Sequence, residues 1–350
     1  MSYINKRKHY KFLLIVLIVI LLVITVISST LGVANINFYQ SMKILSSKIP
    51  LLGKYVNLEG ISSTHKLIIL NLRLPRIILA ALIGAGLSLV GCVFQAIFKN
   101  PMADPYILGI SSGSALGASI AIILGLNIAF LGLSGVTFFA FTGAILTTLL
   151  VYIIAKTGTK LPTNTLLLSG VSVSFLLSSI ISLIMIFNRE QVEQIIFWTM
   201  GSLNSANWKA VISLLPFILI GGFLIFVFSK DLNVMLTGDD TASSLGVEVD
   251  KVKKILLVIS SLIIAACVSV SGIIGFVGLI IPHMIRIIVG PDHRVLLPFT
   301  ALGGGIFMII SDTLARTLAP PAEIPVGAIT SIFGAPYFIY LLIKNKKKVM

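Results

Sequence analysis

Residues 73–98 read RLPRIILAALIGAGLSLVGCVFQAIF. After the two opening arginines the stretch carries no charged side chain, and it is longer than the roughly 20 apolar residues that a helix needs to cross a bilayer. Gly84, Gly86 and Gly91 recur along it, and small residues let helices in a membrane approach one another closely. The stretch therefore predicts a transmembrane helix that packs tightly against its neighbours.

The composition of the chain extends this prediction to most of its 350 residues. Hydrophobic residues make up 57% and charged residues 11%, whereas a typical soluble protein has about 25% charged residues. The mean hydropathy is +1.08, so too few polar side chains remain to cover a surface in water. A soluble enzyme and a disordered chain are excluded. The net charge of +14 is not gathered in a folded basic domain of the kind that indicates a nucleic-acid binder.

Ten apolar stretches are candidates for membrane helices. They cover Phe12–Val33, Leu74–Phe98, Ile107–Leu124, Leu131–Ala155, Leu166–Phe187, Val211–Phe228, Ile255–Val270, Gly275–Val289, Val295–Leu314 and Pro325–Ile343. The first is longer than the apolar region of a signal peptide and no cleavage site follows it, so we expect it to be retained. These spans leave no room for a soluble domain. Residues 1–350 are therefore predicted to form one all-α transmembrane domain.

Lysine and arginine gather at alternate ends of these spans. With the amino terminus inside, most of the 26 basic residues fall on the cytoplasmic side, as the positive-inside rule requires. The cytoplasmic groups are Lys6, Arg7, Lys8 and Lys11; Lys156 and Lys160; Lys251, Lys253 and Lys254; and Lys344, Lys346, Lys347 and Lys348. An even number of spans then places both termini of a multi-pass protein in the cytoplasm.

The predicted extracellular loop, residues 34–72, leads into two arginines that stand against this rule. Arg73 and Arg76 lie at the outer mouth of the second span. Two interpretations stay open. The arginines either anchor in lipid headgroups by snorkelling, or bind carboxylates of an acidic partner, for which the planar guanidinium is well suited.

Asp312 is the one carboxylate well inside a predicted span, and an ionisable residue at such a depth suggests a function. Arg316 follows four residues later, in the order that favours an ion pair along a helix. A locally paired acid is one interpretation. The alternative is a proton-relay carboxylate, which would make the chain a proton-coupled secondary transporter.

The enzyme motifs in the chain lack the context that their chemistry requires. Gly109–Gly113 matches the G-x-S-x-G pattern of serine hydrolases, but the match opens an apolar helix and not a strand-to-helix turn. The P-loop pattern is absent, so any ATP hydrolysis belongs to another polypeptide. Cys92 and Cys267 form no C-x-x-C pair. We expect no catalytic, cofactor or metal site.

The segment between the sixth and seventh spans predicts a short helix in the cytoplasm. Asp239 or Asp240 can cap such a helix, and Gly246 can end it in a left-handed turn. Met235 and Leu245 are expected to be exposed. An interfacial helix is one interpretation, but anionic headgroups would repel its acidic residues. A docking helix for a cytoplasmic partner accounts for the charge better.

A series of short motifs, in one order from about residue 70 to the carboxyl terminus, resembles one permease family. The motifs are Arg73-Leu74-Pro75-Arg76, Gln95, Lys99-Asn100-Pro101-Met102-Ala103-Asp104-Pro105, Leu108-Gly109-Ile110, Trp198-x-x-Gly201-Ser202, Ala242-x-x-Leu245-Gly246-Val247, Gly275-Phe276-Val277-Gly278-Leu279-Ile280-Ile281-Pro282-His283, Asp292-His293-Arg294 and Glu323-Ile324-Pro325-Val326-Gly327. By their order and spacing the chain resembles the FecCD-type permeases of ABC transporters, which take up iron chelates, haem and vitamin B12.

This resemblance implies a type II ABC importer permease in a bacterial cell membrane, paired with a second permease subunit as a homodimer or heterodimer. Two cytoplasmic ATPases would dock on a coupling helix within residues 229–254. An extracellular binding lipoprotein would deliver an iron(III)–siderophore, or a haem- or cobalamin-like complex. The chain itself would hydrolyse no ATP, hold no cofactor and bind no nucleic acid.

The resemblance also implies roles for particular residues. Docking of the binding protein falls to Arg73, Arg76 and Arg316. The cytoplasmic gate falls to Asn100 and Met102, where Met102 replaces the usual Leu, and to Thr163 and Asn164. ATPase coupling falls to Gly238, Asp239, Asp240, Ala242, Leu245 and Gly246. A weakly binding pathway would be lined by small residues such as Ser169, Ser172 and Ser174.

Overall fold

The computed structural model describes residues 3–32, 34, 36–48, 53–126, 134–158 and 161–346. The regular elements of this part of the chain are all helices, and it contains no β-strand, as predicted. The first residues of the fourth predicted span and, among the basic flanks, Lys160, Lys347 and Lys348 lie outside the described residues.

The described residues contain a helix for each of the ten predicted spans. Seven are long and apolar enough to cross a membrane: α1 (Tyr3–Thr30), α4 (Leu74–Ile97), α6 (Gly135–Ala155), α7 (Thr163–Phe187), α9 (Trp208–Val227), α12 (Val249–Ser271) and α14 (His293–Ala315). Two further apolar helices are shorter, α5 (Ile110–Ile123) and α13 (Val277–Val289), and α15 (Val326–Lys346) has a short apolar part, Val326–Leu341. The predicted break between the seventh and eighth spans is confirmed, because α12 ends at Ser271 and Gly272 follows with a φ of +68°.

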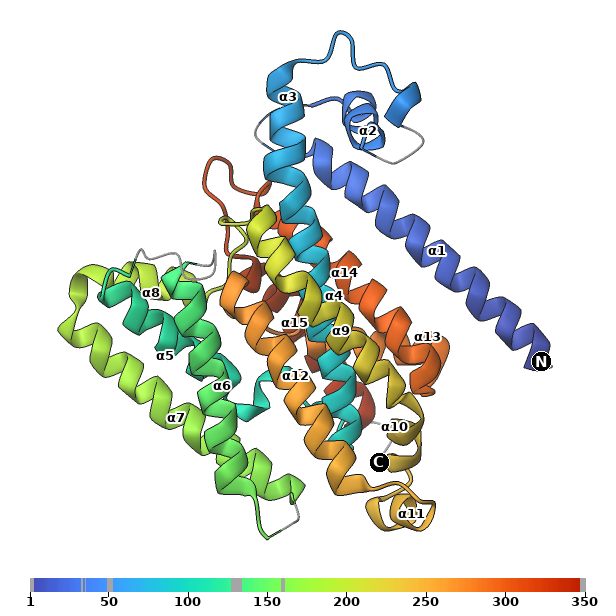
Figure 1. Ribbon diagram of the computed structural model, residues 1–350, viewed down its shortest axis with the longest axis vertical. Helices are drawn as coiled ribbons and strands as arrows, with labels where there is room; N and C mark the ends of the chain where they lie inside the picture. Colours follow the sequence, from blue (N-terminus) through green and yellow to red (C-terminus); the bar gives the residue numbers. More distant parts are fainter. Residues whose placement is uncertain are drawn as a thin grey trace.

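Helix α4 is the centre of the bundle and packs against α9, α12, α13 and α14 (Figure 1). Its glycines make the closest contacts. A Cβ atom added to Gly84 would overlap the carbonyl oxygen of Gly304 on α14, and one added to Gly91 would overlap that of Gly278 on α13. The predicted tight packing through glycine is therefore confirmed as backbone-to-backbone contact.

Helices α5, α6 and α7 form a second group beside this centre, joined to it mainly where α6 packs on α12 (Figure 1). Glycines again sit at the contacts, since a Cβ on Gly117 of α5 would overlap the carbonyl oxygen of Phe139 on α6. Helix α7 packs through a narrow stripe of buried residues at three- and four-residue spacing, and most of its remaining surface is open.

The two ends of the bundle carry different short elements. At one end, here named the α2 end, lie α2 (Phe38–Ser46), η1 (Gly53–Tyr55) and α3 (Ser63–Leu67) (Figure 1). At the opposite end, the α11 end, lie α10 (Ser229–Met235) and α11 (Asp239–Ser244). The described parts of segments 34–72 and 229–254 thus lie at opposite ends, as the predicted topology requires.

A π-helix, η2 (Ile68–Arg73), joins α3 to α4. Residues 63–97 therefore run as one unbroken helix, and Leu72, where the sequence ended the outer loop, lies inside it. Three further short helices complete the described chain: η3 (Pro105–Leu108), η4 (Arg189–Gln191) and α8 (Val192–Thr199).

The contact between Gly91 and Gly278 yields a stability prediction. We expect Gly91→Ala to lower the free energy of unfolding by about 1–3 kcal/mol, because the added methyl group must force two backbones apart. Gly275→Ala is the control, since a Cβ there meets nothing within 4 Å. Thermal unfolding of the purified proteins in detergent measures both. Equal melting temperatures for the two variants would refute the claim that this contact is tight.

Candidate functional site

Asp312 lies near the α2 end of α14 and is paired mainly with an arginine from another helix. Its side chain is 1% exposed. Arg76 of α4 donates from Nε to both carboxylate oxygens, each at 3.0 Å, and from Nη2 to Oδ1 at 2.8 Å. The predicted ion pair with Arg316 is present but longer, at 3.7 Å between Nε and Oδ2. A fork of this kind is among the strongest charge-assisted contacts.

Arg76 also extends the network toward the surface. Its Nη1 donates to Glu323, at 2.9 Å from Oε2. The Arg76 side chain is 13% exposed and that of Glu323 is 33% exposed. One guanidinium therefore joins a buried carboxylate on α14 to a partly open one on the segment before α15.

Arg73 and Arg316 donate hydrogen bonds to the carboxyl-terminal end of α1. A helix leaves the carbonyl groups of its last turn without partners, and cations are favoured there. Arg73 and Arg316 donate to carbonyl oxygens in and just after the last turn of α1. The acceptors of Arg73 are Ser29, Thr30 and Ala34, at 2.7–3.0 Å, and those of Arg316 are Ser28, through its carbonyl and its hydroxyl, and Leu31. Both side chains are 7% exposed.

The structure thus brings Arg73, Arg76 and Arg316 together at the α2 end, as the sequence suggested, but it gives each an acceptor within the chain. Of the two arginines considered for snorkelling, Arg73 donates to carbonyl groups at the end of α1, and Arg76 binds Asp312 and Glu323. Docking of an acidic partner stays a prediction. The end of α1 as an acceptor was missed, because no local pattern links α1 to residues so far along the chain.

The predicted coupling segment contains the expected short helix, α11. Gly238, with a φ of +124°, precedes it, and Gly246, with a φ of +90°, follows its end. Asp239 lies in the first turn and does not cap the helix, whose N-cap is Gly238. Leu245 is exposed as predicted, whereas Met235 is fully buried at the end of α10, contrary to the prediction. The segment folds back onto the bundle at Met235, and the large apolar side chains that it leaves exposed are Leu236, before α11, and Leu245, after it.

The two neighbouring aspartates of α11 have opposite environments. Asp239 accepts from Lys99 at 2.7 Å and from Lys253 at 2.5 Å, whereas Asp240 is exposed. Burial acts to raise the pKa of Asp239, but the hydrogen bonds from Lys253 and Lys99 outweigh it and hold the pKa below its ordinary value. Ala242 is buried beneath the helix. One face of α11 is therefore fixed to the bundle and the other is open.

Helix α10 is fixed at the same end of the molecule through Asn233. This side chain donates to Asp292 at 2.7 Å and accepts from the backbone N–H of His293 at 2.8 Å, at the start of α14. Hydrogen bonds from Arg294 lower the pKa of Asp292 to about 2, so its carboxylate stays charged at neutral pH.

The predicted gate residues lie on two separate segments at the α11 end. Asn100 accepts from the backbone N–H of Met102 at 2.9 Å, which shapes the turn after α4. Met102 is 39% exposed and borders a small cavity against α13 and α15, beside His283 and Tyr337. Thr163 and Asn164 begin α7, and Asn164 is exposed.

The serines suggested for a pathway fall on different sides of α7. Ser169 is buried in the packed stripe, and Ser174 donates its hydroxyl to the Gly170 carbonyl at 2.8 Å. Ser172 is exposed and therefore available to a pathway or a partner. Ser178, Ser179 and Ser182, which the sequence argument did not single out, are exposed as well.

These features define an all-helical, multi-pass membrane protein: a glycine-packed bundle, a charged network at one end and a short helix presented at the other. The FecCD transport family model matches residues 18–344. The chain belongs to this family.

Several relatives share most of the chain. The cobalamin import system permease protein BtuC of Halobacterium salinarum is 45% identical over 81% of this chain and 75% of its own length. The hemin transport system permease protein HmuU of Yersinia pestis is 39% identical over 80% and 84%. The Fe(3+)-citrate import system permease protein YfmD of Bacillus subtilis is 39% identical over 81% and 84%.

A solved structure shares the fold as well. It is described as an inward-facing conformation of a metal-chelate type ABC transporter, and it superimposes with a TM-score of 0.80 at 33% identity, over 95% of this chain and 99% of the other. The family and this likeness confirm the predicted fold. No finding supports the alternative of a proton-coupled secondary transporter, and Asp312 has its charge partners in Arg76 and Arg316.

The pairing of Asp312 with Arg76 yields a prediction about stability. We expect Asp312→Leu to cost about 3–5 kcal/mol, because it leaves a buried guanidinium without its main partner. Adding Arg76→Met should restore much of the loss, since both charges are then removed together. Glu248→Gln, at an exposed pair with Lys251, is the control and should change little. The free energy of unfolding in detergent measures all three, and losses that simply add in the double variant would contradict the pairing.

Proposed function

We propose that this chain is the permease subunit of a binding-protein-dependent ABC importer. The proposed cargo is an iron(III)–siderophore, or a haem- or cobalamin-like chelate. The family match over residues 18–344 carries the proposal. The names of the relatives, which cover cobalamin, hemin and ferric citrate, support a large metal chelate as the cargo class.

The orientation follows the distribution of basic residues. The α11 end is cytoplasmic and carries both termini, and the α2 end faces outward in the cell membrane of a bacterium. The open face of α11, with Asp240, Ser243 and Leu245 exposed, receives an ATPase subunit that supplies the energy. A binding lipoprotein approaches the α2 end.

A second permease subunit completes the pathway beside α7. The exposed face of this helix carries Ser172, Ser178, Ser179 and Ser182. Ser179 and Ser182 donate to carbonyl groups of their own helix, but a row of exposed hydroxyl groups gains little from contact with lipid chains. Such a face suits a pathway or a subunit boundary better. The same face mixes these serines with large apolar side chains such as Phe175 and Leu176, which gives weak, unspecific contacts to a passing ligand.

Docking at the α2 end centres on Arg76. Arg73 and Arg316 are committed to the end of α1, whereas Arg76 holds a partly exposed carboxylate in Glu323. A carboxylate of the binding protein takes the place of Glu323 on Nη1, and Asp312 keeps the guanidinium in position. Arg73 and Arg316 then serve docking by fixing the platform around Arg76.

The coupling helix acts on the gate through Lys99. Asp239 of α11 binds the ammonium group of Lys99, which directly precedes the Asn100–Met102 turn. A displacement of α11 by the ATPase is therefore passed to that turn by one ion pair, while Lys253 holds Asp239 to α12. The exposed Asp240 takes no part in this link.

The direct test of the proposed function is uptake in vesicles that contain the chain with its ATPase and binding protein. We expect uptake of a ferric siderophore, haem or cobalamin to require ATP inside and to persist when a protonophore collapses the proton gradient. Uptake driven by a proton gradient without ATP would refute the importer and restore the secondary transporter.

The coupling link yields a second prediction. We expect Asp239→Asn to lower uptake by about tenfold, which corresponds to about 1.4 kcal/mol, because the neutral side chain weakens the charge-assisted hydrogen bonds from both Lys99 and Lys253. ATP hydrolysis and co-purification of the ATPase should persist, because the open face of α11 is unchanged. Asp240→Asn is the matched control for the link through Lys99. Equal uptake by the two variants would show that Lys99 and Asp239 do not transmit the motion.

A further inference from the structure

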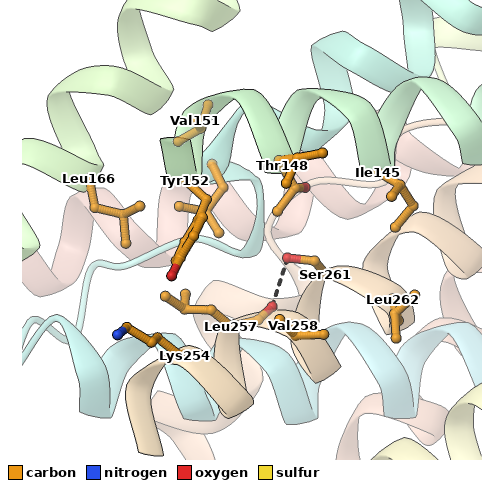
Figure 2. A pocket seen from close by; sticks show the side chains of 12 residues that line it. Ile145, Thr148, Val151, Tyr152, Leu166, Lys254, Leu257, Val258, Ser261 and Leu262 are labelled. Atoms are coloured by element: carbon orange, nitrogen blue, oxygen red, sulfur yellow. Dashed lines mark hydrogen bonds between the residues drawn. The ribbon is translucent and has the colours of Figure 1, made fainter. Parts of the chain in front are cut away.

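A groove runs between α6 and α12, where the α5–α7 group joins the rest of the bundle (Figure 2). Its volume is about 350 Å³. Thr148 and Leu149 lie on the α6 wall, and Val258 and Leu262 on the α12 wall. Leu149 is 52% and Val258 60% exposed, so the groove opens sideways on a surface that two membrane-spanning helices turn to the bilayer.

The walls of this groove offer almost no polar group to a ligand. Thr148 donates its hydroxyl to the Ala144 carbonyl at 2.9 Å, and Ser261 donates to the Leu257 carbonyl at 2.7 Å. Both hydroxyls are thus satisfied within their own helices. Apart from Tyr152 and Lys254, the other lining residues are aliphatic, which suits a hydrocarbon chain and does not suit a polar chelate.

One end of the groove differs from the rest. Figure 2 shows the Lys254 amine and the Tyr152 hydroxyl at the same end, opposite Ile145 and Leu262. The two helices run antiparallel, which explains this arrangement. The last turn of α6, which contains Tyr152, therefore lies at the same end of the groove as the first turns of α12, which contain Lys254. From Lys254 to Leu262 the groove extends about 12 Å along α12, at 1.5 Å per helical residue.

We propose that this groove binds one acyl chain of an anionic phospholipid, with its phosphate at Lys254 and Tyr152. The chain lies along the aliphatic walls toward Leu262, and the headgroup stays at the α11 end of the helices. A cation at the headgroup level attracts anionic lipid, and this charge distinguishes the site from an ordinary lipid-facing surface. The bound lipid spans the seam between α6 and α12 and so steadies the two helix groups against each other.

The test compares two lysines of the same helix. The full chain is placed in nanodiscs of phosphatidylcholine with a minor share of phosphatidylglycerol, and the lipid that stays bound after transfer to detergent is measured by mass spectrometry. We expect phosphatidylglycerol to be enriched several-fold over the bilayer ratio in the parent chain and in Lys251→Gln, whose side chain is exposed beside Glu248. In Lys254→Gln the enrichment should fall to the bilayer ratio.

A second pair of variants tests the acyl chain. Thr148→Trp fills the groove and should remove the bound lipid, whereas Ile153→Trp, at an exposed site of α6 outside the groove, should not. Equal retention in Lys254→Gln and Lys251→Gln, or in both tryptophan variants, would overturn the proposal. Retention of phosphatidylcholine to the same extent would show ordinary lipid contact, and that also overturns it. The measurement needs neither ATPase nor binding protein, so its failure leaves the proposed transport function standing.

Discussion

The close approach of α4 to its neighbours is the constraint on which the rest of the structure depends. Gly91 and Gly84 face Gly278 and Gly304 across contacts that leave no space for a Cβ atom. In a membrane, burial of apolar surface gives little drive for helices to associate, because lipid tails are equally apolar, so packing and polar contacts must hold them. With α13 and α14 held at backbone distance, the loops before and after them are fixed as well.

The network of hydrogen bonds and ion pairs at the α2 end depends on this packing. Asp312 meets Arg76 only because α14 lies against α4, and Arg316 reaches the end of α1 from the same helix. The carbonyl groups at the end of α1 need hydrogen-bond donors, since an unsatisfied backbone group is costly away from water. Two arginines supply them. The cations that stand against the positive-inside rule therefore have a structural use in addition to any partner they bind.

The spans, the glycines that recur along them, the short helix α11 and the exposed Leu245 were all predictable from the sequence, because each is marked by residues close together in the chain. The partner of Asp312 was not. A local rule favoured Arg316, four residues away, but Arg76, 236 residues away, makes the shorter contact. The predicted exposure of Met235 was wrong for a related reason, because its burial arises from tertiary packing of α10, which no local sequence pattern indicates. Likewise, the Lys99–Asp239 link joins two predicted sites whose connection the sequence does not show.

The π-helix η2 sets the orientation of α3 and the preceding segment relative to α4. A π-turn holds one residue more than an α-turn, so deleting one residue between Ile68 and Arg73 would let residues 63–97 run as a regular α-helix. That change would turn α3 and the segment before it by about 100° around the axis relative to α4. The rotation of the α2 end about the helix axis is thus set by the number of residues in η2, and not by the identity of one side chain. In this chain an insertion or deletion within η2, more than a substitution, would change the direction of this surface.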